Sequence, residues 1–510
     1  MHSEKRNKKP NILWLMSDQH NAACLSICGH PDVQTPHLDQ LAQSGIRFDR
    51  AYCNNPICGP SRSCFLTGQT PKTHGITGNY IRNLRSDAPN LATTFRQEGY
   101  QTGLIGKAHL PKAWIDAGFE HQRLCDMTDA APEDPRSCHY FDYLVRNGLG
   151  DAYDLGNRKP GQTGAGFNTF ISEIPQAHCL ETWTGNEAID FLEQRDCDRP
   201  FFLKVSFQRP HEPYSPSAED ADRYDADSIT VPDSACDYFY HAFSGKPRHH
   251  REHIQQPKGS GYPYRSYSRE ALKLQMARHF TLISMIDDQI GRIVEQLKAS
   301  GDYDNTIIAY VADHGDFAGE HGLVLKNLGI YESIHRIPFI LAGPHITPCH
   351  DSETFVESID FFPTLCDLAG IHDAPQTEGL SLTSALQGTE LPHRSHVTCE
   401  WDFYDEPQRQ VYAIRTPAYR FVHYTTRPDD GELYDCIQDP DELENRFHDP
   451  SLAGEKARFL QMIEAYQVQT RRIHTPADDA PLIEKDKDQP TRLIVTGDKT
   501  WSQLAELCPN

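Results

Sequence analysis

The sequence predicts an α/β fold: a large, mixed, mainly parallel sheet sandwiched by helices, followed by a smaller C-terminal domain with a short antiparallel sheet and a helix. Short, continuously apolar segments alternate with amphipathic helical segments over residues 10–390, a pattern typical of strands buried between two layers of helices. Near residue 390 the segments become short, β-branched and aromatic, with turn residues between them, which indicates antiparallel strands. We therefore predict a main domain at 10–390, a small α+β subdomain at 391–475 and a tail at 476–510.

The apolar segments are the predicted strands of the main sheet. Polar residues follow the first four of them, at the strand end where open α/β sheets place their functional sites. In chain order these strands cover residues 11–16, 102–106, 201–208, 306–312 and 337–343.

Amphipathic segments between these strands predict the covering helices. The helix over 35–44 carries Leu38, Leu41 and Ala42 on one stripe and ends at Gly45, a typical stop residue. The longest predicted helix, 272–300, is closed by Gly301. The remaining predicted elements are helices at 90–98, 181–195 and 357–369 and, in the C-terminal subdomain, strands at 396–401, 411–416, 419–425 and 431–436 before a helix at 455–472.

Two long stretches, 112–180 and 215–268, lack strong periodicity and are predicted to be insertions. The second contains a basic patch at 246–253 and an aromatic run at 261–267. Loops of such length in compact domains are usually either functional or disordered. We expect both insertions to border a substrate cleft.

Composition narrows the classes of function. The 510-residue chain has a formal net charge of −23, which argues against nucleic-acid binding and against adhesion to an anionic membrane. No apolar run is long enough for a membrane span.

The first residues lead directly into a strand without a small-residue cleavage site, so a cytoplasmic protein is expected, with a periplasmic or secreted one as the alternative if a leader was removed. The 15 cysteines lack disulfide-framework spacing, which favours free thiols in a reducing compartment.

The segment Cys58-Gly59-Pro60-Ser61-Arg62 predicts a helix start, because proline suits a first helical turn. A side chain at position 58 would lie near the N-terminus of that helix, where free N–H groups favour anions. Arg62 lies one turn later and would point toward the same place. This arrangement suits a nucleophile in an anion-binding site, and a buried structural thiol is the alternative.

Two pairs of polar residues follow predicted strands that are far apart in the sequence. Asp18 and Gln19 follow the first strand, and Asp313 and His314 follow the strand at 306–312. A ligand set of oxygen donors beside one imidazole suits calcium, magnesium or manganese better than it suits zinc, for which thiolates are common ligands. Each pair alone would also fit a hydrogen-bonded strand end, but together they predict a metal site.

A second set of residues, at other strand or loop ends, could bind a tetrahedral oxyanion and protonate a leaving oxygen. It contains three fixed cations and two histidines: Arg62, Lys107, His109, His211 and Lys326.

These motifs, in this order and spacing, resemble those of the formylglycine-dependent sulfatases of the alkaline-phosphatase superfamily. The similarity covers roughly residues 10–450, apart from the two insertions. The matching stretches are Cys58-x-Pro60-Ser61-Arg62 with Leu66-Thr67-Gly68; Gly99-Tyr100-x-Thr102-x-x-Ile105-Gly106-Lys107-x-His109; Asn11-Ile12-Leu13 before Asp18; Pro210-His211-x-Pro213; Asp313-His314-Gly315 with Gly319-Glu320-His321-Gly322 and Lys326; Ile359-Asp360 with Pro363-Thr364-Leu365; and Glu432-Leu433-Tyr434-Asp435 with Asp439-Pro440.

The resemblance implies that a formylglycine-generating enzyme oxidises Cys58 to formylglycine. One hydroxyl of the aldehyde hydrate would attack sulfur and expel the alcohol, and the second would restore the aldehyde and release inorganic sulfate. Residues 10–390 would then be the catalytic domain, acting on a sulfated carbohydrate.

The roles of the site residues are also implied by the resemblance. The metal, calcium with magnesium or manganese as alternatives, would be bound by Asp18, Gln19, Asp313, His314 and residue 58. Arg62 and Lys107 would steady the hydrate, His109 would take its second proton, His211 and Lys326 would hold sulfate and meet the leaving oxygen, and Asn79 would line the sulfate pocket.

Two alternatives stay open. The Asp-Gln pair stands where many family members have Asp-Asp, and it is similar to the pair in choline sulfatases and phosphonate monoester hydrolases, so a phosphonate monoester or phosphodiester hydrolase is the first alternative. A non-catalytic protein that binds sulfated ligands is the second, if Cys58 stays unmodified.

Overall fold

The computed structural model describes residues 9–79, 87–109, 118–126, 138–153, 168–255, 268–326, 328–387, 394–402 and 410–471. The predicted tail at 476–510 and the aromatic run at 261–267 lie outside these ranges. Among the described helices, none is long and apolar enough to cross a membrane.

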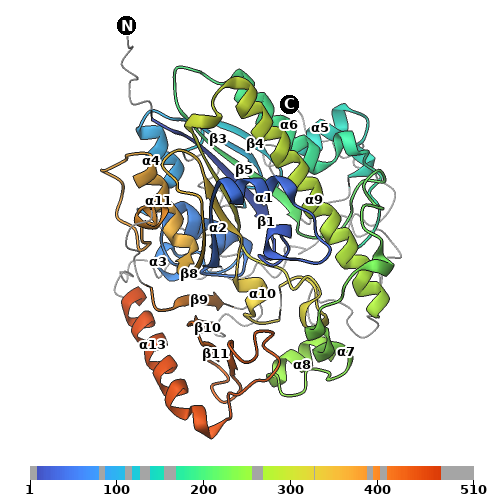
Figure 1. The fold of residues 1–510 in the computed structure, drawn as a ribbon, viewed down its shortest axis with the longest axis vertical. Coiled ribbons are helices and arrows are strands. Elements are labelled where there is room, and N and C mark those ends of the chain that lie inside the picture. Colours follow the sequence, from blue (N-terminus) through green and yellow to red (C-terminus); the bar gives the residue numbers. More distant parts are fainter. Residues whose placement is uncertain are drawn as a thin grey trace, which may run out of the picture.

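An eight-stranded sheet forms the centre of the molecule (Figure 1). Its strand order is β4-β3-β5-β1-β6-β7-β2-β8. Neighbouring strands are parallel except at β7, which runs antiparallel to both β6 and β2. The predicted mixed, mainly parallel sheet is therefore confirmed. Its strands are β1 Asn11–Asp18, β2 Gly45–Tyr52, β3 Gln101–Gly106, β4 His121–Leu124, β5 Phe201–Pro210, β6 Thr306–Ala312, β7 Phe339–Ala342 and β8 Cys349–Glu357.

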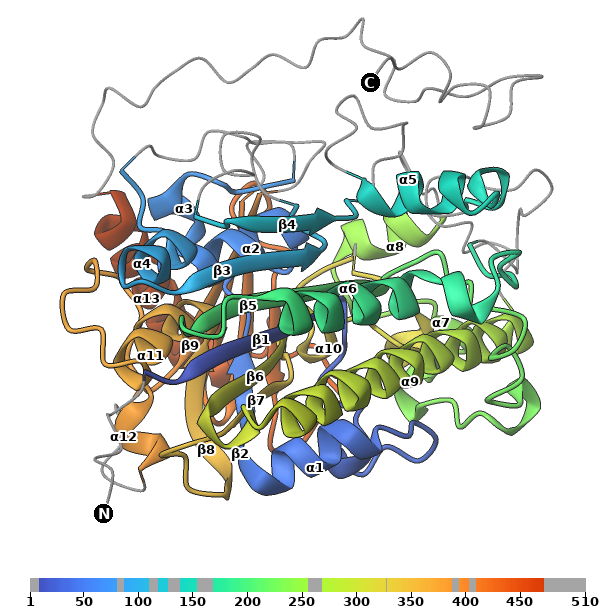
Figure 2. The same cartoon turned by 90° about the horizontal axis from the view of Figure 1, so that it is seen from above.

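Helices cover both faces of this sheet (Figure 2). On one face α1, α6 and α9 bury apolar side chains against the strands, and on the other face α2, α4 and α11 do so. Two cores, one on each side of the sheet, explain why the central strands are apolar along their whole length. The helices are α1 Pro36–Ser44, α2 Cys58–Thr67, α3 Pro71–His74, α4 Leu91–Gln97, α5 His139–Arg146, α6 Leu180–Gln194, α7 Cys236–Phe239, α8 Arg248–Gln255, α9 Arg269–Ser300, α10 Glu332–His335, α11 Phe361–Leu368, α12 Thr383–Leu386 and α13 Ala453–Arg471.

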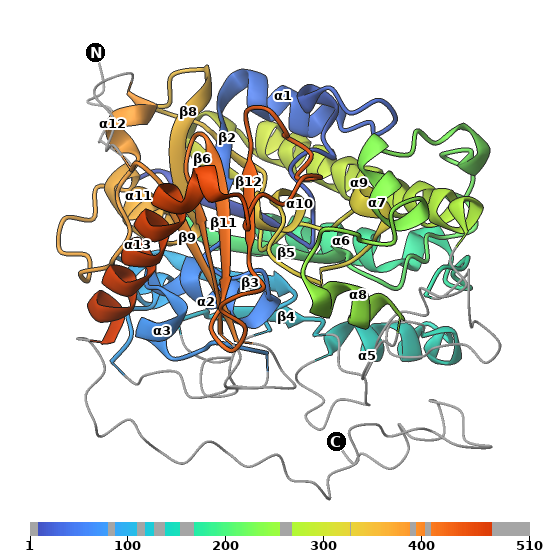
Figure 3. The same cartoon turned by 90° about the horizontal axis from the view of Figure 1, so that it is seen from below.

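The C-terminal part forms the predicted antiparallel sheet, with the order β12-β11-β10-β9. Its strands are β9 Val397–Asp402, β10 Gln410–Arg415, β11 Tyr419–Tyr424 and β12 Glu432–Asp435. One face of this sheet lies against α13 (Figure 3). Phe421 of β11 and Phe459 of α13 belong to the core between them. Apolar side chains of β9, β10 and β11 also pack with Ile57 and Ile330, so this sheet supports the start of α2.

Three strands of the main sheet were not predicted. β4 lies within the stretch 112–180, which is therefore not wholly an insertion, because this strand pairs with β3. It is a short edge strand, and its sequence HQRL contains no apolar run. β2 interrupts its apolar residues with charged ones, and the first half of β8 is largely exposed, so neither shows the continuous apolar pattern of a buried strand.

Candidate active site

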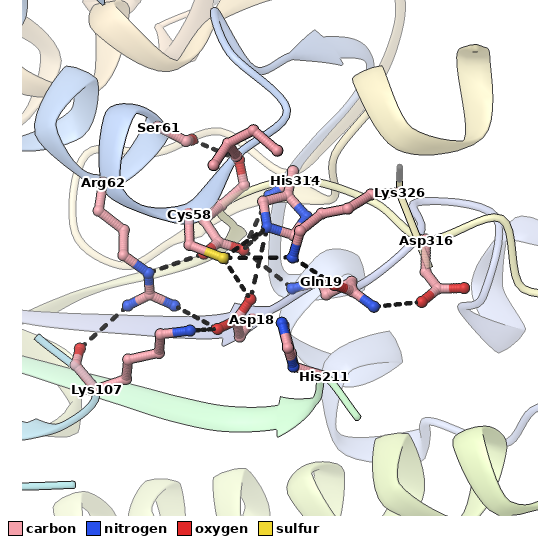
Figure 4. Close-up of polar contacts among 12 residues, drawn as sticks. Asp18, Gln19, Cys58, Ser61, Arg62, Lys107, His211, His314, Asp316 and Lys326 are labelled. Atoms are coloured by element: carbon pink, nitrogen blue, oxygen red, sulfur yellow. Dashed lines mark hydrogen bonds and ion pairs between the residues drawn. The ribbon is translucent and has the colours of Figure 1, made fainter. Parts of the chain in front are cut away.

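Cys58 is the first residue of α2 and lies at the centre of a buried polar cluster (Figure 4). Its side chain is almost wholly buried, and the preceding Ile57 has an extended backbone, so the helix begins at the thiol. The Sγ atom lies 3.2 Å from His314 Nε2, 3.4 Å from Lys326 Nζ and 3.6 Å from Asp18 Oδ1. The structure thus brings the predicted nucleophile together with residues from three distant segments.

The ends of β1 and β6 supply the carboxylates of this cluster. The two strands are parallel neighbours, so Asp18 and Asp313 emerge side by side. Arg62 joins them: Nε lies 2.8 Å from Asp313 Oδ2 and Nη2 lies 3.5 Å from Asp18 Oδ2. Lys107, from the end of β3, forms an ion pair with Asp18.

The predicted metal ligands are close enough to share one ion. Ligand atoms of Asp18, Cys58, Asp313 and His314 all lie within 4.8 Å of one another, and all four residues are buried. Gln19 adds an amide oxygen that accepts a hydrogen bond from Lys326 Nζ at 2.6 Å. Two carboxylates, an amide oxygen and an imidazole suit a hard or borderline divalent cation, so the residues present fit the group.

Positive charge controls the protonation of the cluster. Burial raises the pKa of the Cys58 thiol, but Lys107, Lys326 and His314 outweigh it and hold the pKa well below its usual range. Burial likewise opposes ionisation of Asp18, yet Lys107, His211 and Arg62 lower the pKa of its carboxyl. The site therefore stabilises negative charge at both residues, as an oxyanion-binding site requires.

His211 follows β5 and is close to its sequence neighbour Glu212. Its Nδ1 atom lies 2.9 Å from Glu212 Oε2. Burial has the largest single effect and lowers the pKa of the imidazole, but Glu212, Asp18 and a hydrogen bond to Cys58 together raise it to about 10. His211 is consequently a cation at neutral pH.

His109 and Asn79 also reach the start of α2. The side chain of His109 hydrogen-bonds the Cys58 thiol and lowers its pKa, while the backbone of His109 adopts a φ of +45°. Asn79 Oδ1 accepts a hydrogen bond from the Gly59 N–H at 2.8 Å. The structure thus places every predicted site residue in one cluster around Cys58; their individual roles stay predictions.

Four further residues support this cluster and were not predicted. Ser206 accepts a hydrogen bond from Arg62 Nη1 at 2.7 Å, and Asp126 Oδ1 accepts from the backbone N–H groups of Ala108 and His109 at 2.7 and 3.0 Å. The other two are Glu212 and Asp316. Both of these lie within two residues of predicted histidines, at His211 and His314, which is the signal that could have identified them.

The family model described as Sulfatase matches residues 10–371. The chain belongs to the sulfatase family. It is therefore an enzyme of the sulfuric ester hydrolase class, within the alkaline phosphatase superfamily. A second model, N-sulphoglucosamine sulphohydrolase, C-terminal, matches residues 319–469.

Individual relatives of this sulfatase are similar over nearly their whole length. An N-acetylglucosamine-6-O-sulfatase of Bacteroides thetaiotaomicron is 26% identical, over 97% of this chain and 91% of the relative. A solved structure of a protein in complex with its substrate, D-glucosamine-2-N,6-O-disulfate, is 25% identical, with a TM-score of 0.71 over 93% of this chain and 100% of the other. A phosphonate monoester hydrolase of Agrobacterium radiobacter shares the fold, at 24% identity and a TM-score of 0.74 over 90% and 96% of the two chains.

Proposed function

We propose that this sulfatase removes a sulfate ester group from a sulfated carbohydrate, with Cys58 converted to formylglycine and a divalent metal, calcium in the first instance, at Asp18, Gln19, Asp313, His314 and residue 58. The observation that carries the proposal is the position of Cys58. Its Sγ atom lies between the acidic end of the sheet at Asp18 and the ammonium of Lys326. That is the place from which a nucleophile can reach a sulfate group held by cations.

The metal would supply one kind of chemistry when bound: it would polarise oxygens on residue 58 and on the sulfate group. The protein prepares its site with negative charge at Asp18 and Asp313, which Arg62 and Lys107 hold in place by ion pairs. The same two cations would steady the hydrated form of residue 58.

The reaction then follows from the residues around the hydrate. Asp313 takes the proton of one hydroxyl of residue 58 as the oxygen of that hydroxyl forms a bond to sulfur and the bond between sulfur and the ester oxygen breaks. The leaving oxygen takes a proton from His211 or Lys326, both of which are cationic at neutral pH. His109 accepts the proton of the second hydroxyl, the carbon–oxygen bond to sulfate breaks, and the aldehyde forms again. No water attacks sulfur in this sequence.

The burial of α2 has a consequence for the modifying enzyme. Every residue from Cys58 to Thr67 is buried in the folded chain, and Arg62 is already committed to Asp313 and Ser206. A formylglycine-generating enzyme that reads Cys58, Pro60 and Arg62 could not reach them in this state. We therefore expect modification before α2 packs against the sheet.

A carbohydrate is proposed as the carrier of the ester because a relative is named N-acetylglucosamine-6-O-sulfatase and a similar solved structure contains its substrate, D-glucosamine-2-N,6-O-disulfate. Paired kinetics would test this. The purified enzyme with calcium is assayed on 4-nitrophenyl sulfate, on a 4-nitrophenyl phosphodiester and on a set of mono- and oligosaccharides of glucosamine sulfated at defined positions. We expect kcat/KM to be highest for a sulfated sugar; a higher value for the phosphodiester would overturn the proposed ester class.

The modification has its own test. Peptide mass spectrometry of the protein from its native host should find residue 58 as formylglycine. The matched control is the Cys64→Ala variant, which removes the other cysteine of α2 and should leave the modification in place. A native peptide that carries only unmodified Cys58 would contradict the proposed nucleophile.

A further inference from the structure

The amide of Gln19 is held at both of its ends. Its Nε2 donates a hydrogen bond to Asp316 Oδ2 at 2.6 Å, and its Oε1 accepts one from Lys326 Nζ at 2.6 Å (Figure 4). A carboxylate can only accept and an ammonium can only donate. The amide group therefore has one satisfied orientation, in which its oxygen faces the Cys58 cluster and its nitrogen faces away.

Asp316 is itself fixed by other contacts. Its Oδ1 accepts hydrogen bonds from the backbone N–H groups of Ala318, at 2.7 Å, and Leu325, at 3.1 Å. Its Oδ2 also accepts one from the Tyr214 hydroxyl at 3.1 Å. Asp316 is fully buried, and four donors leave its carboxylate no freedom to turn away from Gln19.

We infer that Asp316 is a positioning residue that fixes the Gln19 amide with its oxygen, not its nitrogen, toward the metal. The inference rests on the metal site of the proposed function. Asp18 and Asp313 present oxygen whichever way their carboxylates turn, but an amide presents a ligand on one side and two N–H donors on the other. A chain with glutamine at this position needs a partner that selects the correct side, and a buried acceptor does so.

The same carboxylate also connects the metal site with the sulfate site. Leu325, whose N–H it holds, directly precedes Lys326, the residue proposed to hold sulfate. Asp316 therefore accepts a hydrogen bond from Gln19 on one side and from the backbone N–H next to Lys326 on the other.

Asp316→Asn tests the inference because its effect has a defined direction. The two backbone N–H groups require an acceptor, so the oxygen of the introduced amide takes the place of Oδ1 and its NH2 group faces Gln19 Nε2. Two donors then oppose each other. If the Gln19 amide turns over, its NH2 group faces the Lys326 ammonium and the metal site instead. Neither orientation then satisfies both ends of the amide, and its oxygen is no longer fixed toward the metal.

The measurement is calcium binding to metal-stripped protein by isothermal titration calorimetry. We expect Asp316→Asn to weaken binding by about 10–100-fold, the usual effect of losing a partner that orients a ligand. The double variant Gln19→Glu with Asp316→Asn inverts the hydrogen bond and leaves the net charge unchanged. The introduced carboxylate accepts from the introduced amide and still directs an oxygen at the metal, so this variant should recover most of the lost affinity.

Tyr214→Phe is the matched control. It removes the hydroxyl that donates to the same Oδ2 atom but leaves an acceptor opposite Gln19, so calcium affinity should stay within about threefold of the wild type. Circular dichroism would establish that each variant is folded. The inference alone would be overturned if folded Asp316→Asn protein bound calcium as tightly as the wild type does. It would also be overturned if the double variant bound calcium no more tightly than Asp316→Asn does. Wild-type protein that binds neither calcium, magnesium nor manganese would overturn the proposed metal site and the inference with it.

Discussion

His211 Nδ1 lies 2.9 Å from Glu212 Oε2, and the carboxylate holds the neighbouring imidazole in its charged form. Burial is the largest single influence on the pKa of His211 and lowers it, but Glu212, Asp18 and a hydrogen bond to Cys58 together raise it to about 10. The pKa of Glu212 is lowered in return. A histidine in this state can hold a sulfate oxygen across the whole physiological pH range.

Glu212→Gln should move the alkaline limb of the pH profile to lower pH. His211 is protonated below its pKa, and removal of the carboxylate lowers that pKa, so the variant loses the imidazolium earlier as pH rises. We expect the limb in kcat/KM for an aryl sulfate to shift by at least about one pH unit. Glu219→Gln, at an exposed position that also follows β5, is the control and should leave the pH profile unchanged. An alkaline limb that does not move in Glu212→Gln would show that His211 does not govern it.

Arg62→Lys should destabilise the fold. The guanidinium pairs with Asp313 and donates to Ser206 Oγ and to the Lys107 carbonyl, at 2.7 and 3.1 Å. Lysine keeps the charge but cannot make the forked contacts. The expected loss is about 2–4 kcal/mol in the free energy of unfolding, measured with urea.

Arg458→Lys is the matched control for that measurement. Its ion pair with Glu455 is exposed, so the change should stay within about 0.5 kcal/mol. An Arg62→Lys protein as stable as this control would mean that the buried guanidinium adds nothing to the fold.

The central strands and the long helices could be predicted from the sequence because their patterns are local. β1, β5 and β6 are continuously apolar, and α9 ends where Gly301 adopts a left-handed conformation. The strands that were missed, β2, β4 and β8, lie toward the edges of the sheet. Half-exposed edge strands carry charged side chains, so their assignment depends on a partner strand that the local sequence does not reveal.

The candidate site could be predicted as a set of residues but not as a network. Asp18 and Asp313 each follow an apolar strand, and the two positions together predict a metal site although neither does so alone. The roles of Ser206 and Asp316 depend on the side chains that they contact in the folded chain. Ser206 contacts Arg62, which is 144 residues away in the sequence. Asp316 contacts Gln19, which is 297 residues away. Such pairings arise from sheet order, which no single segment encodes.

Lys326→Met should strengthen calcium binding while it abolishes sulfate turnover. Lys326 Nζ bonds to Gln19 Oε1, the oxygen that the metal would use, and a nearby ammonium repels a divalent cation. At an effective dielectric constant near 20, a charge pair at close range is worth several kcal/mol, so we expect affinity to rise by at least about tenfold in calorimetry. Lys72→Met, which removes a lysine 3.5 Å from Asp402, should bind calcium like the wild type. Equal or weaker binding by Lys326→Met would place the ion away from this ammonium.

Glu400→Gln should stabilise the protein at pH 8 and much less at pH 5. Glu400 is buried on β9, where desolvation raises the pKa of its carboxyl to about 7, with Lys72 opposing the shift. Between its unfolded pKa, near 4.5, and 7, the folded chain retains a proton that the unfolded chain has released. Stability therefore falls as pH rises through that window.

Glutamine removes this dependence, and the gain over wild type should grow by about 2 kcal/mol from pH 5 to pH 8 in urea unfolding. For Glu464→Gln, on the exposed side of α13, the difference in unfolding free energy from wild type should not grow with pH. If the difference for Glu400→Gln also stayed constant from pH 5 to pH 8, Glu400 would be ionised in the folded chain over that whole range.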